Sequence, residues 1–539
     1  MKTLGLRDII GPVMVGPSSS HTAGALAIAK MARSLCAQAP ARATFTLYGS
    51  FAHTGSGHGT DKALVAGLLG YDASDLEIRD SFSIARDRGV DVAFVRDTDK
   101  HADHPNTVDI LIEEADATRL QVRGVSIGGG AALITRIDGI DVDITGEHTS
   151  VVIRQRDERG VLAHIASCIA ECGVNIATTR MYRTRRGATA YTVMETDDAI
   201  PSLVRDLIAK HPSVLDVRVI PAMNRPVDAA PALDAACAEA RFDAFDFASG
   251  DELAKLCDAQ GCTIAQAYRT REEALCALDG RGAGVDAYLD RVLDIMKSSA
   301  TEPADTPIRS TGGLIGGEAK ALRDMRGQDA ARTPLDPLSS DAVEFALGVL
   351  ETNAAMGRIV AAPTAGSAGV VPAVLLTLAK HRGIPRETLR EGLLAAAAVG
   401  HLIARNASVS GAEGGCQAEI GSAAGMAAAA AVEMMGGTVE QALAAASNAL
   451  TCLMGLVCDP VGGLVEIPCQ KRNATAALTA LASAQIALAG VGNLVGFDET
   501  VAAMDAVGRS LPFELRESAL GGIAAAPSAC AWCAGCENR

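Results

Sequence analysis

The second half of the chain, from Arg241 onward, is dominated by small and aliphatic residues, and this restricts what it can fold into. Long Ala, Leu and Gly segments alternate with short polar, glycine-rich interruptions, and runs of β-branched residues are few. Across the whole chain 49% of the residues are hydrophobic but only 3% are aromatic. Small side chains let helix backbones approach closely. We therefore predict an all-α domain over residues 241–539.

The first part of the chain, residues 1–146, follows a different pattern. Glycine-rich turns separate apolar runs at residues 43–48 and 108–112, and residues 23–36 have helical spacing. Short alternating runs between turn signals are typical of strands, whereas the 3.6-residue spacing indicates a helix. We predict an α/β domain here.

Residues 147–222 predict a third, smaller domain with the order β-α-β-β-α-β. The expected elements lie over residues 150–155, 161–172, 175–182, 188–195, 203–210 and 214–220. This order is that of a ferredoxin-like domain. A Pro- and Ala-rich stretch over residues 223–240 has linker composition. The sequence thus predicts three domains and one linker.

The charge balance excludes some classes of partner. The chain has 48 basic and 64 acidic residues, a net charge of −16, which disfavours nucleic acid and anionic membrane surfaces. No signal peptide is apparent at the N-terminus. Residues 474–497 are uncharged, but their Ala, Thr, Ser, Gln and Gly content favours a buried helix over a membrane span. We expect a cytoplasmic protein.

A hydroxyl-rich motif, Gly-Pro-Ser-Ser-Ser-His-Thr, precedes the first predicted helix. Hydroxyls at a helix N-terminus lie beside unsatisfied N–H groups and the positive end of the helix dipole, a setting that suits a carboxylate or phosphate. The candidate residues are Ser18, Ser19, Ser20, His21 and Thr22. The alternative is an ordinary serine-rich N-cap with an incidental histidine.

A second motif, Gly-His-Gly-Thr-Asp at residues 57–61, places His58 between glycines. A histidine has an ordinary pKa of about 6.5, so an accessible imidazole can act as a base near neutral pH. The alternative is a flexible glycine loop with an exposed histidine.

The chain has 14 cysteines and no apparent secretory signal. In a reducing compartment, clustered thiols more often bind metals or take part in redox chemistry than form disulfides. Cys416, Cys458 and Cys469 lie in polar segments rich in Gly and Pro. Three such thiolates would hold an iron–sulfur cluster with one iron open. Their spacing matches neither ferredoxin pattern, so three unrelated buried thiols remain the alternative.

Taken together, these motifs resemble those of the bacterial iron–sulfur L-serine dehydratases. The distinctive ones are the hydroxyl-rich motif at 16–22, Gly-His-Gly-Thr-Asp, Ser-Gly-Ala-Glu-Gly-Gly-Cys at 410–416, and Cys-Asp-Pro-Val-Gly-Gly-Leu-Val-Glu-Ile-Pro-Cys at 458–469. The middle domain resembles an ACT domain, although Arg159 stands where ACT domains usually have proline. The chain is similar to a small (beta) chain, an ACT domain and a large (alpha) chain fused end to end.

The resemblance implies an L-serine ammonia-lyase that forms pyruvate and ammonia, works in the cytoplasm and assembles as a homodimer or higher homo-oligomer. It implies a [4Fe-4S] cluster on the three cysteines, with no pyridoxal phosphate. His58 would be the catalytic base and His21 the second active-site histidine, while the hydroxyls bind the substrate carboxylate. A regulatory ligand would contact the ACT loops, at Asp157, Gly160, Asn175 and Ile176.

The C-terminus departs from a simple fusion. Some single-chain members of the family end in a cysteine that occupies the open iron, and here Cys530, Cys533 and Cys536 are candidates for a fourth ligand. The alternatives are a frayed tail or a separate metal site. For the whole chain, the alternatives are a lyase acting on threonine or cysteine by the same mechanism, or a non-enzymatic amino-acid sensor.

Overall fold

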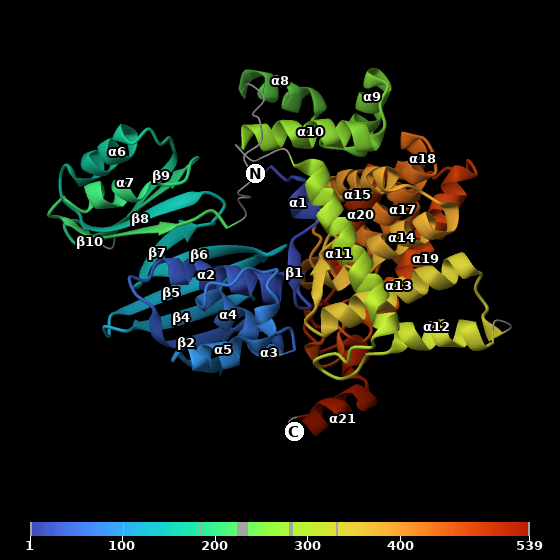
Figure 1. Cartoon of the computed structure of the whole chain (residues 1–539), viewed down its shortest axis with the longest axis horizontal. Helices are drawn as coiled ribbons and strands as arrows, with labels where there is room; N and C mark the ends of the chain where they lie inside the picture. Colours follow the sequence, from blue (N-terminus) through green and yellow to red (C-terminus); the bar gives the residue numbers. More distant parts are fainter. Residues whose placement is uncertain are drawn as a thin grey trace. The chain divides into compact units, whose positions relative to one another are not determined.

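The structure is a computed structural model that describes residues 3–55, 57–100, 102–183, 185–223, 235–279, 284–329 and 332–536 (Figure 1). The chain forms two compact units, Ser20–Val227 and Met1–Ser19 with Asp228–Arg539. Of the linker predicted over 223–240, residues 224–234 lie outside the described part. Residues 235–240 belong to helix α8 (Ala235–Phe245) instead.

The unit of residues 20–227 contains a six-stranded sheet in the order β3-β2-β4-β5-β6-β7. Strands β2 and β3 are parallel and the other neighbours are antiparallel. Helices α2 (Ala25–Ser34) and α4 (Thr60–Leu68) pack together, and α2 lies on the sheet so closely that a Cβ on Gly124 would lie 2.3 Å from Ile28 Cγ2. The strands are β2 (Pro40–Tyr48), β3 (Asp91–Asp97), β4 (Thr107–Glu114), β5 (Arg119–Gly128), β6 (Ala131–Ile137) and β7 (Ile140–Ile144). The predicted mixed α/β character of this region is confirmed.

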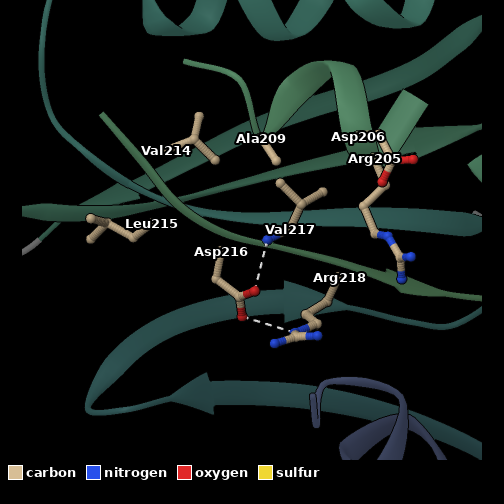
Figure 2. Close-up of a pocket in the computed structure, with 8 residues that line it drawn as sticks. All are labelled: Arg205, Asp206, Ala209, Val214, Leu215, Asp216, Val217 and Arg218. Carbon is tan, nitrogen blue, oxygen red and sulfur yellow. Dashed lines mark hydrogen bonds and ion pairs between the residues drawn. The ribbon is translucent and has the colours of Figure 1, made fainter. Parts of the chain in front are cut away.

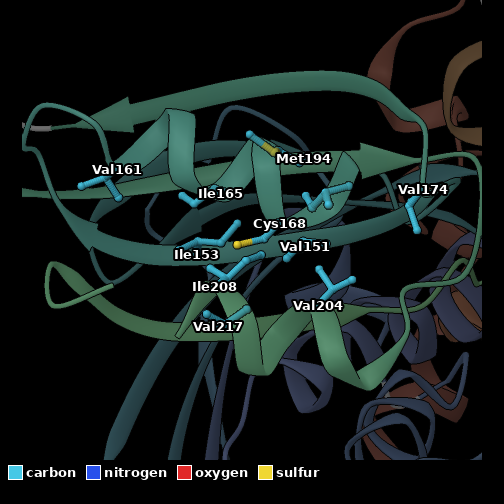
Figure 3. Close-up of a cluster of buried hydrophobic side chains, with 11 residues drawn as sticks. Val151, Ile153, Val161, Ile165, Cys168, Val174, Met194, Val204, Ile208 and Val217 are labelled. Carbon is cyan, nitrogen blue, oxygen red and sulfur yellow. The ribbon is translucent and has the colours of Figure 1, made fainter. Parts of the chain in front are cut away.

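The same unit contains a four-stranded antiparallel sheet in the order β11-β8-β10-β9. Its elements run β8 (Thr149–Arg156), α6 (Val161–Glu171), β9 (Ile176–Arg183), β10 (Thr189–Thr196), α7 (Ser202–Ile208) and β11 (Val214–Ile220). Each lies within a residue or two of its predicted position. Figure 3 shows its core, where Ile165 and Cys168 of α6 pack with Val151, Ile153 and Ile208. The assignment of this region to the ACT family stays a prediction.

The other unit is helical. Its described helices are α1 (Leu6–Ile9), α8, α9 (Gly250–Gln260), α10 (Ile264–Leu278), α11 (Val285–Asp305), α12 (Glu318–Gln328), α13 (Pro337–Ala354), α14 (Val370–Arg382), α15 (Arg386–Asn406), α16 (Gly411–Gly414), α17 (Ser422–Met434), α18 (Val439–Leu453), α19 (Cys469–Leu488), α20 (Phe497–Ser510) and α21 (Pro527–Cys536). Helix α17 is buried along its whole length up to Val432 and packs against α14, α15, α18 and α19. A Cβ on Gly392 would lie 2.6 Å from Met434 Sδ, so α15 and α17 approach closely, as the small residues predict.

Two details of the helical unit differ from the sequence prediction. Residues 241–539 are not entirely helical, because Arg358–Val360 form a short strand, β12. Its antiparallel partner is β1 (Val13–Val15), which we had placed with the α/β domain. Val13 and Val360 face each other in the ladder, and this pairing between distant segments joins the first 19 residues to the helical unit.

No helix among the described residues is long and apolar enough to span a membrane. The uncharged stretch at 474–497 divides between α19, which ends at Leu488, and a loop that leads into α20. Helix α19 buries Ala476, Ala477 and Ala480. The prediction of a buried helix therefore holds for the first part of the stretch only.

Candidate active site

His21 and His58 lie side by side in the unit of residues 20–227, with ring centroids 4.5 Å apart, and both side chains are buried. His21 lies in a π-helical turn, Ser19–Gly24, that runs directly into α2, so three of the four hydroxyl residues lie within this turn. The Thr22 hydroxyl donates a hydrogen bond to the backbone carbonyl of His58 at 2.7 Å. This bond connects the two motifs that the sequence had suggested separately.

Both ring nitrogens of His21 face hydroxyl groups. Nδ1 lies 3.1 Å from Ser20 Oγ, and Nε2 lies 2.9 Å from Ser50 Oγ in helix α3 (Gly49–Thr54). Burial lowers the pKa of His21 well below its usual value, and the adjacent His58 lowers it further. A neutral imidazole has one N–H and one bare nitrogen, so one of these hydroxyls can accept from the ring while the other donates to it. The structure therefore holds His21 as a neutral, oriented imidazole.

The four hydroxyl residues predicted to bind substrate have different surroundings. Ser18 and Ser19 are buried, and Ser19 Oγ accepts a hydrogen bond from the backbone N–H of Ala365 at 2.9 Å. Ser20 and Thr22 instead contact the histidines, as described above. The Ser19 hydroxyl can therefore still donate a hydrogen bond to another acceptor, whereas the Thr22 hydroxyl donates to a backbone carbonyl.

The three cysteines singled out from the sequence come together in the helical unit. Cys416 precedes a π-helical turn (Gln417–Gly421), Cys458 follows α18, and Cys469 is the first residue of α19; all three are buried. A hydrogen bond with Cys416 and burial raise the pKa of Cys458 well above its usual value. Burial, followed by the charge of Cys416, also raises the pKa of Cys469 well above its usual value. The thiols are therefore close enough to influence one another.

Two glutamates that the sequence analysis missed lie beside these thiols. Glu419 Oε2 is 4.0 Å from Cys458 Sγ, and Glu419 Oε1 accepts a hydrogen bond from Thr364 Oγ1 at 2.8 Å. Burial raises the pKa of Glu419 to about 7. Burial and the charge of Glu419 raise the pKa of Glu517 to about 8. The only sequence signal for Glu419 was its position three residues after Cys416, which places both on one side of a helical turn.

An ion pair connects two of the cysteine segments and the C-terminal region. Arg472 Nη1, on α19, donates a hydrogen bond to the Val457 carbonyl and forms an ion pair with Asp459 Oδ1, each at 2.8 Å. Asp459 is buried and also accepts a hydrogen bond from the backbone N–H of Ile523 at 2.8 Å. Positions around Cys458 and Cys469 are thus fixed relative to each other and to residues 516–523.

The C-terminal helix α21 packs on the loop between Cys458 and Cys469. A Cβ on Gly462 would lie 3.1 Å from the Trp532 ring and 3.4 Å from Cys533 Sγ. Cys530 is exposed and its thiol points to the Ala524 carbonyl at 3.9 Å. The side chain of Cys536 lies outside the described part of the chain.

The donor set at Cys416, Cys458 and Cys469 fits an iron–sulfur cluster. Within the described residues, no group of three or more His, Cys, Asp and Glu side chains is arranged to hold a single metal ion. The three cysteines are free, buried thiols from three separate segments, and the charge of Cys416 acts on both Cys458 and Cys469. Thiolate-only ligands are those that iron–sulfur clusters prefer. Three ligands leave one iron of a [4Fe-4S] cluster without a protein thiolate.

The four predicted regulatory residues lie in loops around the small four-stranded sheet. The Asp157 carboxylate accepts hydrogen bonds from Arg183 at 2.6 Å and Gly187 N–H at 3.0 Å, and Asn175 donates to Asp197 at 2.6 Å. Gly160 has φ 91°, a conformation that favours glycine, and Ile176 begins β9.

None of these four residues lines the pocket of ≈ 280 Å³ between α7 and β11. Its charged residues are Arg205, Asp206, Asp216 and Arg218, of which Asp216 and Arg218 form an ion pair at 2.8 Å (Figure 2).

Comparisons with known proteins cover both units. Residues 8–136 match the family model described as serine dehydratase beta chain, and residues 258–524 match that described as serine dehydratase alpha chain. The L-serine dehydratase of Streptomyces coelicolor is 32% identical over 526 residues, covering 95% of this chain and 96% of the relative. That of Helicobacter pylori (strain 26695) is 29% identical over 523 residues, with the same coverage. The L-serine dehydratase alpha chain of Peptoniphilus asaccharolyticus is 47% identical over 236 residues, 44% of this chain and 80% of the relative.

Proposed function

This chain belongs to the serine dehydratase family, as a single chain in which beta and alpha regions are joined, and we propose that it converts L-serine to pyruvate and ammonia. The observation that carries the proposal is the buried thiol site formed by Cys416, Cys458 and Cys469, together with near full-length similarity to proteins named L-serine dehydratase. A sensor or scaffold protein has no need for three coupled buried thiols.

The proposed cofactor is a [4Fe-4S] cluster held by Cys416, Cys458 and Cys469. When bound, it would supply a Lewis acid that makes the β-hydroxyl of serine a better leaving group. Arg472 and Asp459 would keep two of the ligand-bearing segments in register.

His58 is the proposed general base that removes the α-proton of serine. The hydrogen bond from Thr22 fixes the backbone of His58, and the ring of His21 packs against it. Burial, with a smaller contribution from the adjacent His58, lowers the pKa of His21 and keeps its ring neutral. Ser18, Ser19 and Ser20 are proposed to bind the substrate carboxylate, whereas Thr22 is better explained as the residue that positions His58.

The proposed conversion of L-serine to pyruvate and ammonia balances without an oxidant or a reductant. Loss of the α-proton and of the β-hydroxyl, which leaves as water, gives an enamine. The enamine tautomerises to an imine, and hydrolysis of the imine with one water yields pyruvate and ammonia. Proton transfer by a positioned side chain contributes on the order of 10²–10⁴-fold to such a step.

The test is anaerobic quantitation of iron and sulfide combined with a pyruvate assay. We expect wild-type protein to contain about four irons per chain and to form pyruvate from L-serine, with L-threonine and L-cysteine assayed in parallel. Cys458→Ala should lose iron and activity together, whereas Cys452→Ala, at an exposed cysteine on α18, should keep both. Iron-free, inactive wild-type protein would overturn the proposal.

We propose further that Cys533 is the tail cysteine that acts as the fourth cluster ligand in the resting protein. Its sulfur is the described tail thiol nearest the loop between Cys458 and Cys469, whereas Cys530 faces a carbonyl of its own segment. Changing Cys530, Cys533 and Cys536 to Ser should remove any lag in pyruvate formation and alter the cluster spectrum. Unchanged lag and spectrum would contradict this assignment.

The four-stranded domain is proposed to be an ACT domain that senses an amino acid and mediates contacts between chains. Its element order supports this, and both outer strands, β9 and β11, have one unpaired edge within the described sheet. Deletion of residues 147–222 should change the oligomeric state measured by light scattering, or the response to serine. A deletion variant that changes neither would contradict the proposal.

A further inference from the structure

Glu419 occupies a distinctive position beside the thiol site. It lies on the turn that follows Cys416, with Oε2 4.0 Å from Cys458 Sγ, and its other oxygen is held by the Thr364 hydroxyl at 2.8 Å. The side chain is only half-buried, unlike the fully enclosed cysteines. Its carboxylate is therefore oriented on one side and still accessible to a small molecule.

Two glycines lie next to this carboxylate, where a side chain would be too close to it. A Cβ on Gly411 would lie 2.6 Å from Glu419 Oε2, and a Cβ on Gly366 would lie 3.2 Å from Oε1. Any larger residue at position 411 would collide with the carboxylate. Glycine at these two positions lets the Glu419 carboxylate lie close to the backbone of both segments.

No cationic side chain neutralises Glu419 in the part of the chain that the structure describes. Arg472, the basic residue that interacts with Cys416 and Cys469, is engaged by Asp459 and the Val457 carbonyl. The nearby charged group is another acid, Glu517. A partly buried carboxylate without a positive partner is costly, so the site favours entry of a cation.

The proposed substrate supplies such a cation. L-Serine carries a carboxylate, which needs hydrogen-bond donors, and an α-ammonium, which needs an acceptor. The residues assigned from the sequence are hydroxyls, histidines and thiols, and none of them is an anionic oxygen. We propose that Glu419 binds the α-ammonium of the amino-acid substrate, with Thr364 as the residue that orients it. This inference rests on the proposed function, because it assumes that an amino acid occupies the thiol site.

The test compares two unreactive ligands that differ in the ammonium group. L-Alanine keeps the α-ammonium and lacks the leaving group, whereas propanoate lacks both. Their dissociation constants are measured by anaerobic titration of the holoenzyme, without turnover. In Glu419→Gln we expect at least a tenfold loss of affinity for L-alanine and less than a threefold change for propanoate.

Controls separate recognition from folding and assembly. Iron and sulfide contents are measured on every variant. Glu413→Gln, at an exposed glutamate on the neighbouring α16, should bind both ligands like wild type. Thr364→Val keeps the carboxylate of Glu419 but removes its hydroxyl partner, and it should lower the affinity for L-alanine by a smaller factor than Glu419→Gln. If Glu419→Gln does not assemble the cluster, Thr364→Val provides the test.

The outcomes are distinct. An equal loss for L-alanine and propanoate, or no loss for either, would overturn the role of Glu419. Wild-type protein that retains iron but forms no pyruvate would overturn the proposed function instead, because the titration does not depend on turnover.

Discussion

Burial shifts the pKa values of ionisable groups in the histidine site and in the thiol site in opposite directions. Burial lowers the pKa of His21 in one unit, whereas burial raises the pKa of Glu419 and Glu517 in the other. The adjacent His58 adds to the shift of His21 and the charge of Glu419 adds to that of Glu517, whereas the hydrogen bond from Thr364 opposes the shift of Glu419. In both sites burial therefore favours the uncharged form of the group, whether that group is a base or an acid.

The two sites differ in how they are assembled. The histidine site uses residues 20–22, 50 and 58, which fall within 39 residues of sequence and are connected by hydrogen bonds. The thiol site draws on residues 364, 416–419, 458, 469 and 517, which meet only after α17, α18 and α19 have packed. A site of the second kind depends on the helical core and should respond to changes in it.

The largest expected effect is on kcat, from a substitution in the histidine site that leaves the thiol site unchanged. His58→Gln should lower kcat by about 10²–10⁴-fold, because the base is removed. Iron and sulfide content should be unchanged, since no cluster ligand is altered. His53→Gln, at an exposed histidine on α3, is the matched control and should leave kcat as in wild type. Retention of kcat within tenfold in His58→Gln would assign the base to another residue.

An intermediate effect is expected from a substitution in the hydrophobic core of the four-stranded domain, which contains no candidate catalytic residue. Ile165→Ala removes a fully buried side chain from the core of the four-stranded domain and should cost about 2–5 kcal/mol of local stability. Hydrogen exchange of amides in residues 149–220 measures it, with Leu162→Ala, 41% exposed on the same helix, as the control. Iron content should not change. Loss of iron in Ile165→Ala alone would show that this domain supports the thiol site.

The smallest effect extends the comparison to a third buried histidine. Burial, followed by the charge of Arg271, lowers the pKa of His401 on α15 to about 4, while Asp246 opposes and Arg405 adds to the shift. The folded state therefore binds fewer protons than the unfolded state between about pH 6.5 and pH 4, and stability falls as the pH falls through this range.

His401→Phe should reduce that decline, measured as the difference in unfolding free energy between pH 7 and pH 4.5. Because the protein has more than one unit, the transition of the helical unit must be followed separately. An identical pH dependence in the variant and wild type would assign the decline to other groups.

Much of the fold could be predicted because its signals are local. Alternating burial of Val108, Ile110 and Ile112 marks β4, and the spacing of Val161, Ile165 and Ile169 marks α6. These patterns arise from the two-residue period of a strand and the 3.6-residue period of a helix, which neighbouring residues establish. The pairing of β1 with β12 could not be found in this way, because Val13 and Val360 are adjacent only in space.

The sequence by itself determined the candidate site residues: the hydroxyl-histidine motif, His58 between glycines and the three cysteines in polar segments each stand out locally. Only the tertiary structure decided their partners. It joined Thr22 to the His58 carbonyl and brought Glu419 to Cys458 and Thr364. The physical reason is that residue types and short-range spacing specify donors and local conformation, whereas burial and electrostatic coupling arise only when distant segments exclude water together.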